Sequence, residues 1–250
     1  MSTWSQRGVL LLITTLLSCS SNNGPAGGTI VGAGSSAKDY LSAQTYSSLI
    51  VEIQAVSGYR PSATTQSNLV SFLQARLNKP GGITVQVDAD IASPGQSSYS
   101  LSAVQAVESA NRKLQAGGSQ AVAYFLFLDG ASTSDSSSGS ILGIAHGASS
   151  VVIFEKTIQS LAGGIGQPSL AVLESTVSEH EFGHLLGLTN VGSPMQTDHQ
   201  DSAHGKHCSV TSCLMYWQVD TSNFVGNLLG GSIPQLDPDC LADLQAAGGK

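Results

Sequence analysis

His180, Glu181 and His184 form the pattern His-Glu-x-x-His, a spacing that suits metal chemistry. On a helix, residues four apart share a face, so the two imidazoles can hold one metal ion between them. Glu181 is displaced around the helix from His180, and its carboxylate can therefore reach a metal-bound water without being a ligand. Two nitrogen ligands and one carboxylate base are what metal-assisted hydrolysis requires.

A surface helix that happens to carry two histidines is the alternative explanation of this pattern. The residues that follow the His-Glu-x-x-His pattern favour a metal site instead. Gly187 lies three residues after His184, where a helix must end and the chain must turn back, and glycine tolerates the left-handed conformation of such an ending. A histidine-rich segment and a segment with two cysteines, residues 208–215, then follow.

The run from His180 to Gly187 resembles the first part of HExxHxxGxxH, the motif of the metzincin clan of zinc peptidases. The third metal ligand of that motif should stand three residues after the glycine. Asn190 occupies this position, and asparagine is a poor zinc ligand. We regard it as a residue that ends the helix.

A later segment, His207-Cys208-x4-Cys213-x-Met215, resembles the archaemetzincin version of the motif, in which a cysteine directly follows the third histidine. This resemblance implies that residues 191–206 are a 16-residue insertion, that His207 is the third ligand, and that Met215 is the Met-turn residue beneath the metal. The later CxxC pair with which archaemetzincins help to hold a second zinc ion is absent.

The resemblance implies an α+β, metzincin-like fold with a mixed twisted sheet, an active-site helix, and a small irregular C-terminal part that holds the Met-turn and a terminal helix. It also implies a zinc endopeptidase with one catalytic Zn²⁺ and Glu181 as general base. Asp198 and His199 are alternative third ligands. Two other functions stay open: an inactive surface binding module, suggested by Asn190 and the insertion, and a zinc hydrolase that acts on a non-peptide substrate.

Periodicity and chain breakers predict the elements that position these residues. Alternating or continuous apolar runs predict strands over 48–56, 83–87, 121–128, 141–145 and 150–154, and helical spacing predicts helices over 64–77, 98–114, 168–184 and 238–246. The run 121–128 is apolar almost throughout and predicts a central strand. By the same resemblance, an edge strand containing Gly143, Ile144 and Ala145 would pair with extended substrate.

The N-terminus predicts export from a bacterial cell. Arg7 precedes an apolar run over 9–17 that is too short to span a bilayer, and Cys19 ends a sequence resembling a lipobox. We expect a lipoprotein signal peptide over 1–19, a flexible Gly/Ser/Asn-rich tether over 20–45, and a single catalytic domain over 46–250. We expect a lipid at Cys19 to anchor the protein to a membrane of the cell envelope, such as the outer membrane. The alternative is simple secretion out of the cell.

The charge of the chain limits the classes of molecule that it is expected to bind. A net charge of −7 without a basic patch argues against nucleic acid, so a protein or peptide substrate is expected, with membrane contact through the lipid anchor only. In an oxidising compartment, Cys208 and Cys213 predict a disulfide that clips the loop carrying His207. The alternative is that both are zinc-bound thiolates. Cys240 is then a free buried thiol or part of another pairing, and the sequence indicates no oligomeric state.

Overall fold

The computed structural model describes Met1 and residues 36–228 and 231–250. The predicted signal peptide, the proposed lipidation site Cys19 and the first part of the predicted tether lie outside this range. Among the described helices, none is long and apolar enough to cross a membrane.

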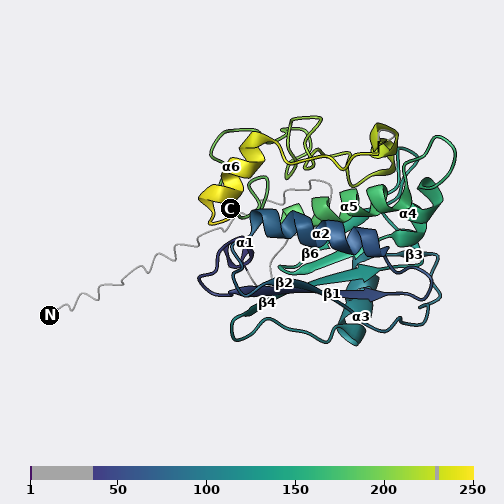
Figure 1. Cartoon of the computed structure of the whole chain (residues 1–250), viewed down its shortest axis with the longest axis horizontal. Helices are drawn as coiled ribbons and strands as arrows, with labels where there is room; N and C mark the ends of the chain where they lie inside the picture. Colours follow the sequence, from purple (N-terminus) through teal and green to yellow (C-terminus); the bar gives the residue numbers. More distant parts are fainter. Residues whose placement is uncertain (2–35, 229–230) are drawn as a thin grey trace.

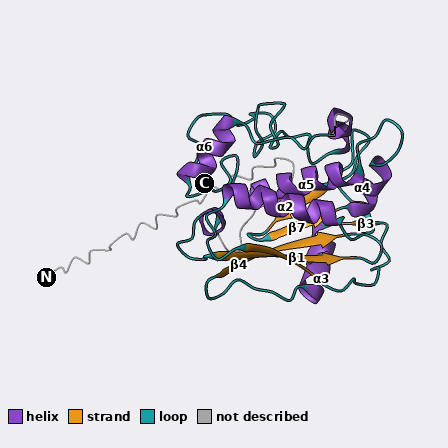
Figure 2. Ribbon diagram, in the orientation of Figure 1, coloured by secondary structure: helices purple, strands orange, loops and turns teal. Residues whose placement is uncertain are grey.

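A five-stranded mixed sheet forms the centre of the molecule, with strand order β2-β1-β4-β7-β6 (Figure 2). Four strands are parallel, and only the edge strand β6 runs antiparallel to its neighbour β7. The predicted α+β class with a mixed sheet is therefore confirmed. The sheet strands are β1 (Ser48–Ala55), β2 (Ile83–Val87), β4 (Gln120–Phe127), β6 (Gly143–His146) and β7 (Ser150–Ile153).

The strand β4 is central, as its apolar sequence predicts. All of its residues after Gln120 are buried, because helices cover both faces of the sheet. Helices α2 (Ala63–Arg76) and α5 (Leu170–Leu185) lie together on one face, and α3 (Leu101–Asn111) lies on the other (Figure 1). The larger apolar core lies between the sheet and the α2–α5 layer, and a smaller one lies under α3.

Several short elements of the structure were not predicted from the sequence. The structure adds α1 (Ala37–Leu41), α4 (Glu155–Leu161), a 3-10 helix η1 (Ser222–Leu228), and a second, two-stranded sheet of β3 (Ser98–Tyr99) and β5 (Ala131–Ser132). The helix predicted over 98–114 is correspondingly shorter. The tether predicted over 20–45 is wrong for its last part, because Tyr40 and Leu41 on α1 are fully buried in the larger core.

The segment between α5 and the last helix, α6 (Pro238–Ala246), is long, and its described residues form no strand. It runs along the side of α5 that faces away from the sheet (Figure 1). Asp237 caps α6 by accepting a hydrogen bond from the backbone N–H of Cys240, and Pro238 opens the helix, which spans the residues that the sequence predicts. This irregular segment carries His207, Met215 and two of the three described cysteines, Cys208 and Cys213, whereas Cys240 lies on α6.

Candidate metal centre

Helix α5 carries the His-Glu-x-x-His pattern and has defined signals at both ends. The hydroxyl of Ser169 accepts a hydrogen bond from the backbone N–H of Val172 at the N-terminus. At the C-terminus, Gly187 adopts φ 78°, and its N–H and that of Leu188 donate to the carbonyls of His184 and Gly183. This pair of bonds is the Schellman motif, which ends the helix one turn after the histidines. The predicted role of Gly187 is confirmed.

The structure brings His207 to the two histidines of α5. One ring nitrogen from each of His180, His184 and His207 lies within 4.8 Å of the others. The Nε2 atoms of His180 and His184 are 3.2 Å apart. The Nε2 atom of His207 is buried and has no hydrogen-bond partner among the described residues. Three converging imidazoles with a nitrogen left unpartnered fit a divalent transition metal such as zinc.

Backbone carbonyl groups hold the imidazoles in this orientation. Nδ1 of His180 donates to the carbonyl of Leu214 at 2.7 Å, and Nδ1 of His207 donates to the carbonyl of His204 at 3.2 Å. The ring of His184 likewise bonds to the backbone of Leu188. A proton fixed on Nδ1 leaves the Nε2 lone pair of His180 and of His207 directed at the shared space, which is the tautomer that a metal ligand needs.

Burial keeps these rings neutral. It lowers the pKa of His180 to about 3 and that of His207 to about 4, and it lowers the pKa of His184 well below its ordinary value. Protonating any one ring would place a charge in a buried site beside two other imidazoles. Neutral imidazole is the form that coordinates metals, so the site is prepared for a cation rather than for protons.

Glu181 is linked to the edge strand of the sheet. Its Oε2 accepts a hydrogen bond from the backbone N–H of Ala145 at 2.6 Å, and its buried Oε1 has no hydrogen-bond partner among the described residues. A side chain at Gly143 would collide with Glu181, because a Cβ there would lie 2.8 Å from the carboxylate. The missing side chain therefore lets the carboxylate lie against β6.

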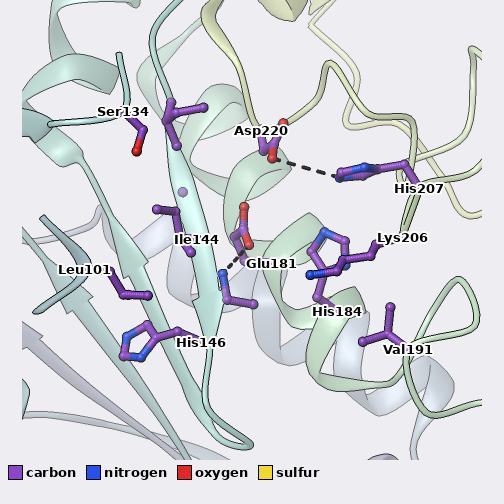
Figure 3. Close-up of a pocket in the computed structure, with 13 residues that line it drawn as sticks. Leu101, Ser134, Ile144, His146, Glu181, His184, Val191, Lys206, His207 and Asp220 are labelled. Atoms are coloured by element: carbon purple, nitrogen blue, oxygen red, sulfur yellow. Dashed lines mark hydrogen bonds and ion pairs between the residues drawn. The ribbon is translucent and has the colours of Figure 1, made fainter. Parts of the chain in front are cut away.

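The centre opens into a cavity of about 290 Å³ beside β6. Figure 3 shows Glu181, His184, His207 and Asp220 turned toward a common space, while His146 lies on the other side of the strand. The cavity has an apolar part, to which Leu101, Ile141, Ile144 and Val191 contribute. It thus joins the polar centre to a surface that can accept apolar side chains.

Asp220 is a residue of this cleft that sequence patterns do not reveal. Its carboxylate lies 3.9 Å from Nε2 of His207, and its oxygens are within 4.8 Å of ligand atoms of His180 and Glu181. Burial raises the pKa of Asp220 to about 7, and burial together with the charge of Asp220 raises the pKa of Glu181 well above its ordinary value. Two carboxyl groups confined with three imidazoles form a site that a cation would stabilise.

Met215 lies buried beneath α5, as expected for a Met-turn. A Cβ at Gly183, on the helix face between His180 and His184, would overlap the sulfur of Met215. Close packing at this point sets the distance between the helix and the segment that supplies His207. The same segment supplies the Leu214 carbonyl that orients His180.

The alternative third ligands lie elsewhere. Asp198 is exposed, and His199 is buried beside Cys208 and Asp243 rather than beside His180. Asn190 adopts a left-handed backbone with φ 62° in the turn after α5. His207, which directly follows the inserted segment 191–206, is thus the residue that joins the α5 histidines.

The predicted disulfide between Cys208 and Cys213 is not present in the structure, where Cys208, Cys213 and Cys240 are free buried thiols. The sulfur of Cys213 lies 3.7 Å from that of Cys240, on α6, because α6 packs over the loop. His199, Cys208, Asp237 and Cys240 form a second group of side chains able to hold a metal ion. The sequence missed this group because its members lie up to 41 residues apart.

Comparison with known proteins adds no relatives. No protein-family model matches the chain, and no curated protein matches it in sequence.

Proposed function

We propose that this protein is a zinc-dependent endopeptidase of the metzincin clan, exported by a bacterium. The observation that carries the proposal is the convergence of His180, His184 and His207 next to the unpartnered Oε1 of Glu181, in a cleft beside the edge strand of the sheet. A zinc ion held by the three imidazoles would lower the pKa of a water molecule toward about 7 and offset charge that develops on a substrate carbonyl.

Glu181 is the general base in this proposal. Its Oε1 is the free oxygen, so it accepts the proton of the attacking water and later delivers it to the leaving amine. The other oxygen stays fixed by the N–H of Ala145. The base is therefore positioned by the strand that also forms one wall of the cleft, and substrate bound along that strand would meet Oε1 in a constant geometry.

The strand β6 is suited to hold an extended peptide. The backbone N–H of Phe154, just past β7, donates to the carbonyl of Leu142, so in the alternating antiparallel pattern Gly143 and Ala145 direct their polar groups away from β7. The bond from the N–H of Ala145 to Glu181 agrees with this direction. A peptide can add to this edge through main-chain hydrogen bonds, with Ile144 and Ile141 near its side chains.

The arrangement of the fold supports the clan assignment. A sheet of four parallel strands with one antiparallel edge strand lies against the helix that carries the His-Glu-x-x-His pattern. A Schellman turn at Gly187 follows, and a buried methionine lies beneath the histidines. The two features that depart from the clan pattern, Asn190 and the insertion, do not prevent His207 from reaching the α5 histidines.

Replacing the base tests the proposal. Glu181→Gln keeps the shape of the side chain but removes its basicity, so we expect zinc to stay bound while cleavage of an unfolded protein substrate falls about 10²- to 10⁴-fold. Glu179→Gln is the matched control, since Glu179 is also buried on α5 but neighbours Arg76 in a different pocket. Elemental analysis for zinc and a peptide-release assay give the two readouts.

Full zinc-dependent cleavage by Glu181→Gln would contradict the mechanism. Zinc bound without cleavage of any peptide by the parent protein would favour an inactive surface binding module. Hydrolysis of amides or esters without hydrolysis of peptides would favour a zinc hydrolase of another substrate class. Loss of activity in Glu179→Gln as well would show that the assay reports folding rather than chemistry.

A further inference from the structure

Asp220 is an acidic residue of the cleft to which the zinc and general-base chemistry gives no role. Among the described residues that line the cavity, only Glu181 and Asp220 are acidic. Oδ2 of Asp220 lies 3.9 Å from Nε2 of His207, and an oxygen of its carboxylate lies within 4.8 Å of one of Glu181. Figure 3 shows both carboxylates facing one space. The side chain of Asp220 is 21% exposed, so a bound substrate can touch it.

The backbone of Asp220 is hydrogen-bonded to the chain just before β6. Its carbonyl accepts from the N–H of Leu142 at 2.8 Å, and the N–H of Ser222 donates to the carbonyl of Ser140 at 2.9 Å. This pairing is antiparallel and occupies the edge of the sheet as far as Leu142. The edge that a peptide can join therefore begins at Gly143, and Asp220 lies beside its first residue.

Asp220 and Glu181 are thus both attached to the strand that would bind the substrate. Glu181 bonds to the N–H of Ala145, three residues after Leu142. Strand residues rise by about 3.3 Å each, so the two points of attachment are about 10 Å apart along the strand. The carboxylate of Asp220 extends from its own point back toward that of Glu181. Along β6, Asp220 lies on the N-terminal side of Glu181.

The direction of a bound peptide places its leaving nitrogen on the Asp220 side. Antiparallel strands pair more stably per residue than parallel ones, so we expect a peptide to join β6 in the antiparallel direction. Its chain then runs from the His146 end of the strand toward Gly143. With the scissile carbonyl carbon beside Oε1 of Glu181, the nitrogen of the same bond is the next backbone atom toward Asp220.

The leaving nitrogen becomes positively charged during peptide hydrolysis. The oxygen of water forms a bond to the carbonyl carbon, and the C–N bond breaks with its electron pair on nitrogen. Both protons of the water reach this nitrogen in turn through Glu181, so the products are a carboxylate and an ammonium group. A cation held by the three imidazoles favours the ionised form of Asp220. An ionised carboxylate that accepts a hydrogen bond from the nitrogen stabilises the charge as it develops.

We propose that Asp220 is a second catalytic residue, which accepts a hydrogen bond from the leaving nitrogen while Glu181 carries the protons. The proposal rests on the proposed peptidase function, because it names a further residue of the same site. It also narrows the substrate class. A bond whose leaving group is an amine benefits from Asp220, whereas the alcohol that leaves an ester takes up one proton and departs uncharged.

A peptide and its matching ester test the proposal. The pair consists of a peptide that contains a bond cleaved by the parent and the depsipeptide with an ester at that bond. Asp220→Asn keeps the shape of the side chain but removes its charge. We expect kcat for the peptide to fall about 10- to 100-fold, the loss expected for a hydrogen bond to a charged group. KM, zinc content and hydrolysis of the ester should stay near those of the parent. Asp198→Asn, at an exposed position of segment 191–206, is the control.

A binding measurement tests Asp220 without turnover. It uses the metal-free full chain, because a metal ion would itself bind an amine. The probes are 3-methylbutylamine and the neutral alcohol of the same shape, 3-methylbutanol. The amine is charged at about pH 8, since an alkyl amine such as that of lysine has a pKa of about 10.4. We expect the parent to bind the amine more tightly than the alcohol in an NMR titration, and Asp220→Asn to lose this preference.

Equal losses of peptide and ester hydrolysis in Asp220→Asn would overturn the proposal, because they would indicate a structural role. A preference for the amine that survives the substitution would also overturn it. Loss of zinc from Asp220→Asn as complete as that from His207→Ala would make Asp220 a metal ligand and contradict the role proposed here. If the parent cleaves no peptide at all, the peptidase function itself fails, which is a different result from cleavage that does not depend on Asp220.

Discussion

His207 and Cys208 are neighbours in the sequence, yet their side chains belong to two different groups of metal-binding type. The ring of His207 joins the histidines of α5 at the cleft, and the sulfur of Cys208 lies with His199 and Cys240 under α6. The first group opens into a cavity of about 290 Å³, whereas the second is sealed by protein on all sides. One loop therefore supplies both centres, with successive side chains directed to opposite sides.

The partners of the histidines differ in the same way. At the cleft, backbone carbonyls orient His180 and His207, and the Oε1 of Glu181 remains unpartnered. Under α6, a buried carboxylate orients His199, and backbone N–H groups surround the sulfurs. Three ligands with an open position suit chemistry on a bound molecule, and four protein ligands suit stabilisation of a fold. The comparison agrees with the proposal that the open group in the cleft serves catalysis, and it suits the closed group under α6 to a structural role.

Among the variants that separate the two groups, we expect His207→Ala to have the largest effect on metal content and hydrolysis. Removing one of three ligands should release the cleft metal and lower peptide hydrolysis at least about a hundredfold, because a bound zinc ion supplies several kcal/mol of transition-state stabilisation. The chain should keep one zinc ion and its resistance to unfolding by urea. Zinc content, hydrolysis rate and urea midpoint are measured on the same preparation. His204→Ala, on the same loop, is the control.

If His207→Ala keeps two zinc ions, the cleft centre does not depend on His207. If it loses both, the two centres are not separate, and the assignment of one to catalysis and the other to structure fails.

A smaller but more selective effect is expected from Asp243→Asn. The amide of asparagine retains one oxygen for the N–H of Gln196, but its NH₂ group faces Nε2 of His199. His199 must then accept at Nε2 and carry its proton on Nδ1, the atom that faces the sulfurs. We expect zinc affinity at this centre to fall about 10- to 100-fold, the usual cost of losing an outer-shell partner.

Competition with a chromophoric chelator measures that affinity, and Asp239→Asn on the same helix is the control. Hydrolysis by the zinc-saturated variant should be unchanged, since Asp243 does not line the cleft. If Asp243→Asn binds zinc at this centre as tightly as the parent does, Asp243 does not orient His199.

The sequence predicts the cleft better than the sealed cluster, for a physical reason. His180, Glu181 and His184 lie within one helical turn, and helix geometry alone places them on one face. The apolar run of β4 and the glycine at Gly187 likewise encode their local structure directly. The apolar runs also predict that a sheet forms, because buried strands must pair. The mixed sheet was expected only from the family resemblance, and the sequence did not predict the strand order.

Groups assembled by tertiary packing leave no local pattern. Asp220 reaches the cleft from an irregular loop, and Cys240 reaches Cys213 only because α6 packs over that loop. For this reason the sequence favoured a short-range disulfide between Cys208 and Cys213, whereas the structure shows three free thiols. The short helix α1 was missed because a run of five residues is too short to show a period.

A third buried cluster shows what happens where no ligand set is available. Glu155 on α4 and Glu174 on α5 are both fully buried, and each has one oxygen without a hydrogen-bond partner among the described residues. Burial, and then the charge of Glu174, raise the pKa of Glu155 to about 9. Among the described residues, no histidine or thiol joins this pair. The raised pKa therefore favours the protonated form of Glu155.

This difference predicts how stability changes with pH. Unfolded Glu155 has an ordinary pKa near 4.5, so between that value and about 9 the folded chain binds a proton that the unfolded chain has lost. Stability must then decrease as pH rises through this window. Between pH 6 and pH 8.5, we expect the free energy of unfolding of the parent to fall more than that of Glu155→Gln, by on the order of 2 kcal/mol.

Urea unfolding of zinc-saturated protein at several pH values gives the slope of the free energy of unfolding against pH, for the parent and for Glu155→Gln. Zinc binding contributes equally to parent and variant, so the difference between the two slopes isolates Glu155. Asp90→Asn, at a surface ion pair with Arg60, should keep the slope of the parent. Equal slopes in the parent and Glu155→Gln would mean that Glu155 is ionised in the folded chain, and a cation at this third cluster would then have to balance its charge.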